Sequence, residues 1–377
     1  MTPRQRHLET LLYGKPDRIP FLPGGPREST LKAWYSQGLA DGADWYAELL
    51  KAIGLDDPDP GPKTSAGVQF QMIPEFEQKI LERKIGSIVV QDWKGNICEI
   101  SDRYDPSYCG GKGGHFDFCT RRWIKCPVEN RDDWEEMKAR YNPDDSERYP
   151  VDYAERIVRL RERDYFNSIS ISGPFWQLRE WMGFEGLCMA FIDSPDFVRA
   201  QLKFWEEYIC VMLDKIFADY TPDAIHVSED MAYKAKAMIS MDMTREFIMP
   251  VWKRWADLIK SAGVPLFMVD SDGYVGELIP LWIESGFHVN DPQEVAANND
   301  LPAYSREFGK KMGYSGGVDK RAIAKGGEVI RDEMRRLQPV IDAGGYIPGC
   351  DHGVPHDISW PNFIEYSKLL GHATGWL

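Results

Sequence analysis

The chain has 377 residues, of which 43% are hydrophobic and 28% charged, as in ordinary globular proteins. Its 59 acidic and 45 basic residues give a formal net charge of −14, which argues against nucleic acid or an anionic membrane surface as a partner. No apolar run approaches the roughly 18 residues of a membrane span, and the first residues contain no signal-peptide core. Seven scattered cysteines without a CxxC pair fit a reduced compartment, so we expect a cytoplasmic protein.

Short β-prone runs that alternate with segments of helical periodicity predict the organisation of the chain. The first helix is expected to begin with Thr2 as its N-cap and Pro3 as its first residue. The predicted strands are Ile19–Leu22, Val68–Ile73, Ser168–Ser172, Ala224–Val227, Pro265–Val269, Phe287–Val289, Met312–Tyr314 and Gly345–Ile347. The predicted helices that follow strands include Thr244–Ala262, Val275–Ser285, Leu301–Lys310, Glu328–Ala343 and Trp360–Leu370.

This alternation favours parallel strands that are joined by crossover helices. Eight such units predict a closed (β/α)8 TIM barrel that forms a single domain over residues 1–377. An open doubly wound sheet is the alternative. It has little support, because no G-x-G-x-x-G motif follows the first strand.

The stretch Ile85–Lys125 interrupts the alternation. Its first half reads as a β-hairpin with Lys94-Gly95-Asn96 at the turn. The glycine-rich run CGGKGGHFDF follows, and it lacks the G-K-[ST] ending of a phosphate-binding loop. We therefore expect an inserted hairpin and glycine-rich loop, at about residues 85–125, that form a flap over the barrel mouth.

Polar residues follow the later predicted strands, where a barrel enzyme builds its active site. The candidates at these strand ends are Glu229, Asp230, Asp270, Asp272, Asn290 and His352. Since Glu229 and Asp230 are adjacent, only one of them is expected to face the mouth. We predict catalytic roles, as a base or a ligand, for Glu229 or Asp230 and for Asn290, with helix capping as the structural alternative.

Asp270 and Asp272 form the densest pair of candidates. Residues two apart in an extended segment point to the same side, so both carboxylates face one point. Two charges of the same sign that lie this close require a cation, a shared proton or many hydrogen bonds. The alternative for Asp272 is to cap the helix that begins near Val275. His352 lies in the turn GCDHGVP, where it either enters the cleft or bonds to a surface loop.

Aromatic residues and one histidine are candidates for contact with a substrate. Phe175 and Trp176 follow the third predicted strand, where they either pack in the core or line a wall for a planar ligand. His226 lies within a predicted strand and is either a core histidine or a substrate contact. We predict substrate binding for all three residues.

The sequence resembles the uroporphyrinogen decarboxylase superfamily, which includes decarboxylases and corrinoid-dependent methyltransferases. The opening TPRQRHLETLLYGKPDRIPF is similar to the first helix and strand of that superfamily. The later segments that carry the resemblance are SEDMAYKAKAMISMDMTREFIMPVWKRW, YSGGVDKRAI and GCDHGVPHDISWPNF. The resemblance implies a (β/α)8 barrel, and a homodimer is the expectation for the superfamily.

The resemblance also implies a metal site. True decarboxylases carry an R-Q-A-G-R type motif after the first strand, but here GGPRESTLKAWY keeps only Arg27. The methyltransferase branch binds zinc through H-x-C-G after strand five and a cysteine after strand eight. The matching positions hold Asp270, Asp272 and His352, with Cys350 as a rival for the third. Zinc or another divalent metal is therefore expected at these residues.

An oxygen-rich ligand set leaves a metal a stronger Lewis acid, which suits polarising an ether or phenol oxygen. We therefore expect a methyltransferase that moves a methyl group from a small-molecule donor to the corrinoid of a partner protein. A methoxylated aromatic compound is one candidate donor. The alternatives are a metal-free decarboxylase of a small or tetrapyrrole carboxylic acid, and a non-catalytic barrel that binds a tetrapyrrole or a partner.

Overall fold

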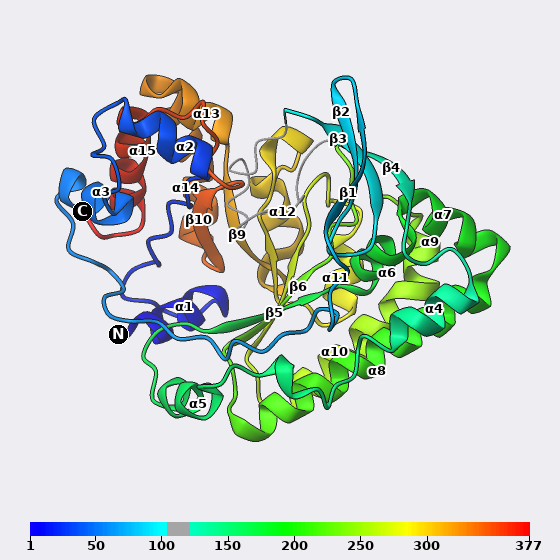
Figure 1. The fold of residues 1–377 in the computed structure, drawn as a ribbon. Helices are drawn as coiled ribbons and strands as arrows, with labels where there is room; N and C mark the ends of the chain where they lie inside the picture. Colours follow the sequence, from blue (N-terminus) through cyan, green and yellow to red (C-terminus); the bar gives the residue numbers. More distant parts are fainter. Residues whose placement is uncertain (104–120) are drawn as a thin grey trace.

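The computed structural model describes residues 1–103 and 121–377, and their strands form two separate sheets (Figure 1). The strands are β1 Lys79–Lys84, β2 Ser87–Gln91, β3 Ile97–Ser101, β4 Arg121–Lys125, β5 Ser168–Ser172, β6 Ala224–Ser228, β7 Leu266–Asp270, β8 Val289–Asp291, β9 Gly313–Val318 and β10 Tyr346–Cys350. The helices are α1 Pro3–Leu11, α2 Glu28–Tyr35, α3 Trp45–Ile53, α4 Arg131–Lys138, α5 Tyr153–Arg161, α6 Pro174–Met182, α7 Phe184–Asp193, α8 Pro195–Asp219, α9 Met241–Met243, α10 Met249–Ser261, α11 Ile279–Glu284, α12 Leu301–Phe308, α13 Lys320–Lys325, α14 Gly327–Ala343 and α15 Trp360–Ala373.

The larger sheet consists of six parallel strands in the order β10-β9-β8-β7-β6-β5. It confirms six of the eight predicted strands. Successive strands of the sheet are neighbours, and helices connect them and surround the sheet (Figure 1). This is the α/β class that the alternation predicted. Among the described residues, the strand ladder does not close from β10 back to β5.

The predicted strand Ile19–Leu22 is an extended segment without strand pairing. Pro20 and Pro23 lack the amide hydrogens that a ladder requires, which explains the difference. The segment still lies against β10, because a side chain at Gly349 would come within 2.6 Å of the Leu22 carbonyl oxygen. It therefore occupies the place of a first barrel strand without its hydrogen bonds.

The predicted strand Val68–Ile73 is also unpaired, because an arginine side chain takes its carbonyl groups. Arg148 is fully buried, and its Nη1 donates to the carbonyl oxygens of Gln69 and Gln71 at 3.1 and 2.8 Å. The Arg148 backbone carbonyl in turn accepts the Gln69 amide at 2.8 Å. These bonds satisfy the backbone that a neighbouring strand would otherwise pair with.

The predicted helices are present, with shifted ends. Helix α1 begins as expected, with Thr2 and Gln5 forming a reciprocal capping box and Pro3 in the first turn. The segment predicted to be one helix from Thr244 is divided into a π-helical turn, Thr244–Ile248, and the regular helix α10. No helix in the described ranges is both long and apolar enough to cross a membrane.

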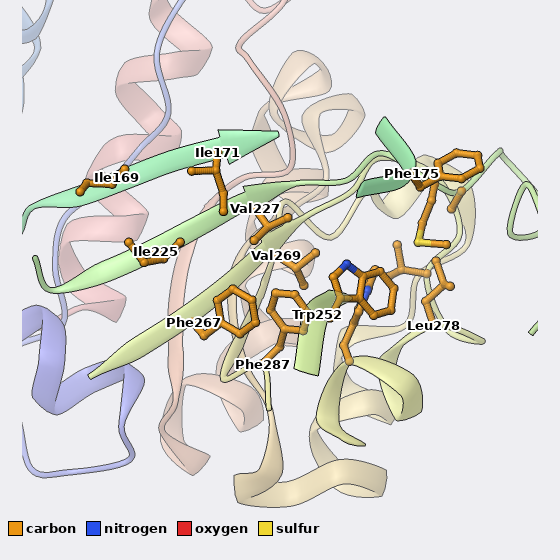
Figure 2. Close-up of a cluster of buried hydrophobic side chains, with 14 of the residues drawn as sticks. Ile169, Ile171, Phe175, Ile225, Val227, Trp252, Phe267, Val269, Leu278 and Phe287 are labelled. Carbon is orange, nitrogen blue, oxygen red and sulfur yellow. The ribbon is translucent and has the colours of Figure 1, made fainter. Parts of the chain in front are cut away.

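One face of the parallel sheet packs against the helices (Figure 2). Alternate residues of three neighbouring strands point to this side and are buried, namely Ile169, Ile171, Ile225, Val227, Phe267 and Val269. Trp252 of α10 and Phe287 pack against them, with the Phe267 and Phe287 ring centroids 3.9 Å apart. Because side chains alternate along a strand, Ser172, His226 and Asp270 are left to face the interior.

The smaller sheet is antiparallel, with the order β1-β2-β3-β4, and confirms the predicted hairpin. The turn between β2 and β3 forms around the buried Asp92, whose carboxylate accepts the amides of Lys94 and Asn96 at 3.0 and 2.9 Å. The insertion is larger than a hairpin, because β1 and β4 extend it on both sides. The predicted glycine-rich run lies within residues 104–120, outside the described residues.

Candidate active site

The ends of β6, β7 and β8 place an acid–base cluster in the interior. Ser228, Asp270 and Asp291 are aligned on neighbouring strands. His226, one side-chain step earlier on β6, has its Nε2 3.0 Å from the Asp291 Oδ2. The register of the parallel sheet thus brings His226, Asp270 and Asp291 together, and we call these three residues the acid–base cluster.

The pKa values of the acid–base cluster are strongly shifted. Burial, followed by the charge of Asp291, raises the pKa of Asp270 to about 7. Burial opposes protonation of His226, but the charge and hydrogen bond of Asp291 outweigh it and raise the pKa to about 9. Within the described residues, the Asp270 carboxyl has no hydrogen-bond partner. The cluster therefore holds a transferable proton at neutral pH.

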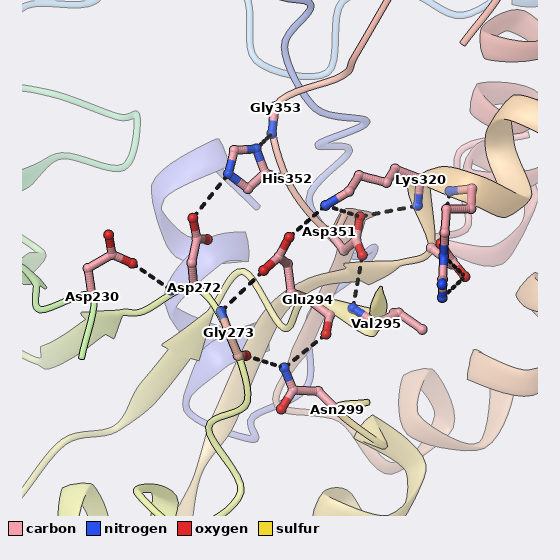
Figure 3. Close-up of polar contacts among 12 residues, drawn as sticks. Asp230, Asp272, Gly273, Glu294, Val295, Asn299, Lys320, Asp351, His352 and Gly353 are labelled. Carbon is pink, nitrogen blue, oxygen red and sulfur yellow. Dashed lines mark hydrogen bonds and ion pairs between the residues drawn. The ribbon is translucent and has the colours of Figure 1, made fainter. Parts of the chain in front are cut away.

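His352 and Asp272 form a second pair at the mouth (Figure 3). The His352 Nε2 lies 3.2 Å from the Asp272 Oδ2, while its Nδ1 faces the Arg27 Nη2 at 3.1 Å and the Gly353 amide at 2.7 Å. The hydrogen bond to Asp272 raises the pKa of His352. Burial opposes ionisation of Asp272, but its bond to His352 outweighs this and lowers the pKa of Asp272.

A network below this pair fixes the loops that carry it (Figure 3). Glu294 accepts the Lys320 Nζ at 2.8 Å and the Gly273 amide at 3.1 Å. Asp351, which is fully buried, accepts the amides of Lys320 and Val295 at 3.1 and 2.9 Å. The ends of four strands, β7 to β10, are tied together in this way, so the mouth is preorganised.

Asp230 connects the mouth to α6. Its backbone has φ +45°, and its carboxylate accepts the Asp272 amide at 3.0 Å. Arg179 of α6 donates to the Asp230 carbonyl at 3.0 Å and lies 3.5 Å from its carboxylate. Burial and then the charge of Asp272 raise the pKa of Asp230. The Arg179 guanidinium also stacks on Trp176, 4.3 Å from the ring centroid.

Glu229 points away from the mouth into the protein. Its Oε1 accepts the Phe175 amide at 3.0 Å, in the first turn of α6, and its side chain fills the space above Gly173. Burial raises the pKa of Glu229 to about 8, although the Phe175 amide opposes this. Phe175 is itself fully buried. Glu229 and Phe175 therefore fix α6 on β6. Of the predicted aromatic pair, Phe175 and Trp176, only Trp176 faces a cavity.

Asn290 also points away from the interior. Its Nδ2 donates to the Val269 and Asp291 carbonyl oxygens, both at 3.1 Å, and its Oδ1 accepts a hydrogen bond from Gln293. The amide is therefore used within the protein. Asp291, the next residue, reaches the interior in its place.

The predicted metal ligands do not form one site. Asp272 pairs with His352, whereas Asp270 belongs to the acid–base cluster. In the part of the chain that the structure describes, no three His, Cys, Asp or Glu side chains are grouped so that they could hold a metal ion. Cys350, the rival for the third position, is buried, and burial raises its pKa. The residues present therefore do not fit the expected zinc site.

A cavity of about 840 Å3 lies beside the mouth, between α6, β4 and the loop that follows β6. Its lining includes Trp123, Trp176, Arg179, Tyr233, Lys236 and Met238. A smaller cavity of about 280 Å3 shares Lys94, Trp176 and Glu180 with it and reaches Ser172 and Ser228. Ser228, which lines the smaller cavity, is aligned with Asp270 of the acid–base cluster on the neighbouring strand.

Comparison with known proteins identifies the family. The family model described as uroporphyrinogen decarboxylase (URO-D) matches residues 123–366, more than half of the chain. The chain belongs to the uroporphyrinogen decarboxylase family. No match was found among curated proteins.

Among solved structures, this family member is similar to a methyltransferase from Methanosarcina mazei. The two share 15% sequence identity with a TM-score of 0.56, over 100% of this chain and 98% of the other. At this identity the likeness shows a common fold. A B12-independent methionine synthase from Shewanella sp. W3-18-1, in complex with selenomethionine, is 14% identical with a TM-score of 0.41, over 60% of this chain and 67% of the other.

Sequence reasoning missed three residues of the site in this family member. They are Asp291, Glu294 and Lys320. Asp291 and Glu294 follow the sixth predicted strand within five residues. Their position just after a strand, where a barrel enzyme builds its active site, was therefore a signal that could have identified them. The contact between Lys320 and Glu294 joins two loops far apart in sequence, and no local pattern indicates it.

Proposed function

We propose that this protein transfers a methyl group from a small methoxylated aromatic compound to a corrinoid protein. The observation that carries the proposal is the aromatic-lined cavity beside a protonated acid–base cluster. The cavity suits a planar apolar donor, and the cluster supplies the proton that its oxygen atom requires. Membership of the uroporphyrinogen decarboxylase family and a fold shared with a methyltransferase support it.

In the proposed reaction the bond between the methyl carbon and the ether oxygen breaks. The corrinoid protein is the second substrate, and its reduced cobalt supplies the electron pair that bonds to the methyl carbon. The leaving oxygen takes the proton of Asp270, whose pKa near 7 suits a general acid at neutral pH. His226, protonated up to about pH 9, stands beside Asp270 as the group that restores its proton.

Decarboxylation is the second candidate, because the acid–base cluster could equally protonate a carbanion without a metal. The charges at the mouth disfavour it. Its carboxylates are Asp230, Asp270, Asp272, Asp291 and Glu294. Arg27, Arg179 and Lys320 already contact His352, Asp230 and Glu294. The remaining cation, protonated His226, is paired with Asp291. A substrate carboxylate that entered this mouth would meet repulsion.

The experiment is a methyl-transfer assay with the purified protein, 1,2-dimethoxybenzene or 3-methoxybenzoate, and chemically reduced cobalamin. We expect a demethylated phenol to form while the absorbance of reduced cobalamin is lost. Asp270→Asn should lower kcat roughly 100-fold, the scale of lost general-acid catalysis. Asp196→Asn, on the exposed surface of α8, is the matched control. Release of CO2 without phenol formation would replace this proposal with the decarboxylase.

A further inference from the structure

The larger cavity has both an aromatic wall and an excess of positive charge. Trp123, Phe184 and Tyr233 line it and keep 52%, 47% and 73% of their surface exposed. Exposed aromatic side chains that gather around a hollow are typical of a surface that a ligand covers. The charged residues of the lining are Lys94, Arg121, Arg179, Lys236 and Glu180.

Three of the four cations already have a carboxylate partner. Lys94 pairs with Glu180, Arg121 lies 3.0 Å from the buried Asp92, and Arg179 lies 3.5 Å from Asp230. Within the described ranges, no ion pair is recorded for Lys236. Its ammonium group is therefore the cation that a bound anion could neutralise.

The backbone around Lys236 is held in place. The Lys236 carbonyl accepts the Tyr233 amide at 2.8 Å, and Ala232 pairs with Ala237 in an antiparallel bridge. The Tyr233 carbonyl accepts the amide of Tyr274, from the loop after β7, at 2.9 Å. Lys236 is therefore presented from a fixed turn that is tied to the loop carrying Asp272.

From these contacts we infer that the substrate is an aromatic carboxylate. Its ring lies in the larger cavity and its carboxylate binds Lys236, while its neutral methoxyl end faces the smaller cavity and the acid–base cluster. This arrangement keeps the negative charge of the ligand away from the acidic mouth. The inference rests on the proposed function for the reaction at the methoxyl end, but the binding selectivity can be measured without turnover.

The test compares two ligands of the same shape by calorimetric titration, 3-methoxybenzoate and its neutral amide, 3-methoxybenzamide. We expect the carboxylate to bind about tenfold more tightly, since a charge-assisted hydrogen bond in a partly enclosed site exceeds a neutral one. Lys236→Met should remove most of this preference while leaving the affinity for the amide unchanged. Lys234→Met is the matched control, because Lys234 is also exposed but does not line the cavity.

The outcomes separate this inference from the proposed function. Equal binding of both ligands, or a preference that survives Lys236→Met, overturns the inference even if methyl transfer occurs. Failure of both ligands to bind also overturns it. A carboxylate preference that depends on Lys236, in a protein that transfers no methyl group, supports the inference and rejects the proposed reaction.

Discussion

The Nε2 of His226 lies 3.0 Å from the Oδ2 of Asp291, and this contact joins the middle of β6 to the end of β8 across β7. Asp270, at the end of β7, is the aligned neighbour of Asp291. A histidine flanked by two carboxylates keeps its proton well above neutral pH. The properties of the acid–base cluster follow from this contact.

Replacement of Asp291 by Asn should lower the pKa of His226 from about 9 to its ordinary value of 6.5 or below, because burial then outweighs the remaining charge of Asp270. In the native protein, the stability that this pair contributes is complete below pH 6.5 and is lost as the pH rises through about 9. Titration of the imidazole proton by NMR measures the change directly. A pKa that stays near 9 in the variant would show that Asp291 is not the cause.

Glu229 adds a second loss of stability with rising pH. Its pKa is raised from 4.5 to about 8, so between these values the folded state binds a proton that the unfolded state has released. Stability therefore falls as the pH rises from about 4.5 to 8. Glu229→Gln keeps the acceptor for the Phe175 amide and removes this dependence, which should raise the melting temperature at pH 9 by roughly 2 to 5 °C. The exposed substitution Glu185→Gln is the control, and an equal shift in both variants would contradict the assignment.

Gly273 leaves no room for a side chain. Its φ is +83°, and a Cβ atom there would lie 2.7 Å from the Ala232 backbone, which anchors the turn of Lys236. Gly273→Ala should destabilise the protein by more than the roughly 1 kcal/mol of backbone strain alone and weaken ligand binding. Gly263→Ala has a similar φ of +74° but open space, so it isolates the strain. Denaturant unfolding should show a larger loss of unfolding free energy for Gly273→Ala than for Gly263→Ala. Equal losses would show that the clash with Ala232 does not contribute.

Chelation of metal ions should leave the protein unchanged. Asp272 and His352 pair with each other and Asp270 belongs to a separate cluster, so the described residues give a divalent ion no three-ligand site. After dialysis against EDTA, we expect the melting temperature and the binding of 3-methoxybenzoate to match those of the untreated protein. A loss of either that added zinc restores would reinstate a metal site at these residues.

The sequence predicted the fold better than the site, and particular residues show why. A run such as Ser168–Ser172 is a strand because its alternating isoleucines are buried against helices. Ile19–Leu22 has the same apolar character, but Pro20 within it and Pro23 just after it lack the amide hydrogens of a strand ladder. For Val68–Ile73, the competing partner is the Arg148 side chain, 75 residues or more away along the chain, which no local pattern reveals.

The error at β8 has a different cause. The sequence placed the end of this strand at Val289, whereas it continues to Asp291. Successive side chains of a strand alternate between its two faces. A prediction that ends the strand too early therefore misses which of the next residues faces the interior. Asn290 therefore follows the predicted strand but bonds to the backbone, whereas Asp291 reaches the interior and pairs with His226.

Part of the wall of the larger cavity belongs to a different sheet from the acid–base cluster. Hydrogen-bond register between parallel strands fixes His226, Asp270 and Asp291, whereas Trp123 and Arg121 come from β4, which is not part of that ladder. Substitutions in the smaller sheet can therefore reshape the wall while the proton-transfer groups keep their positions.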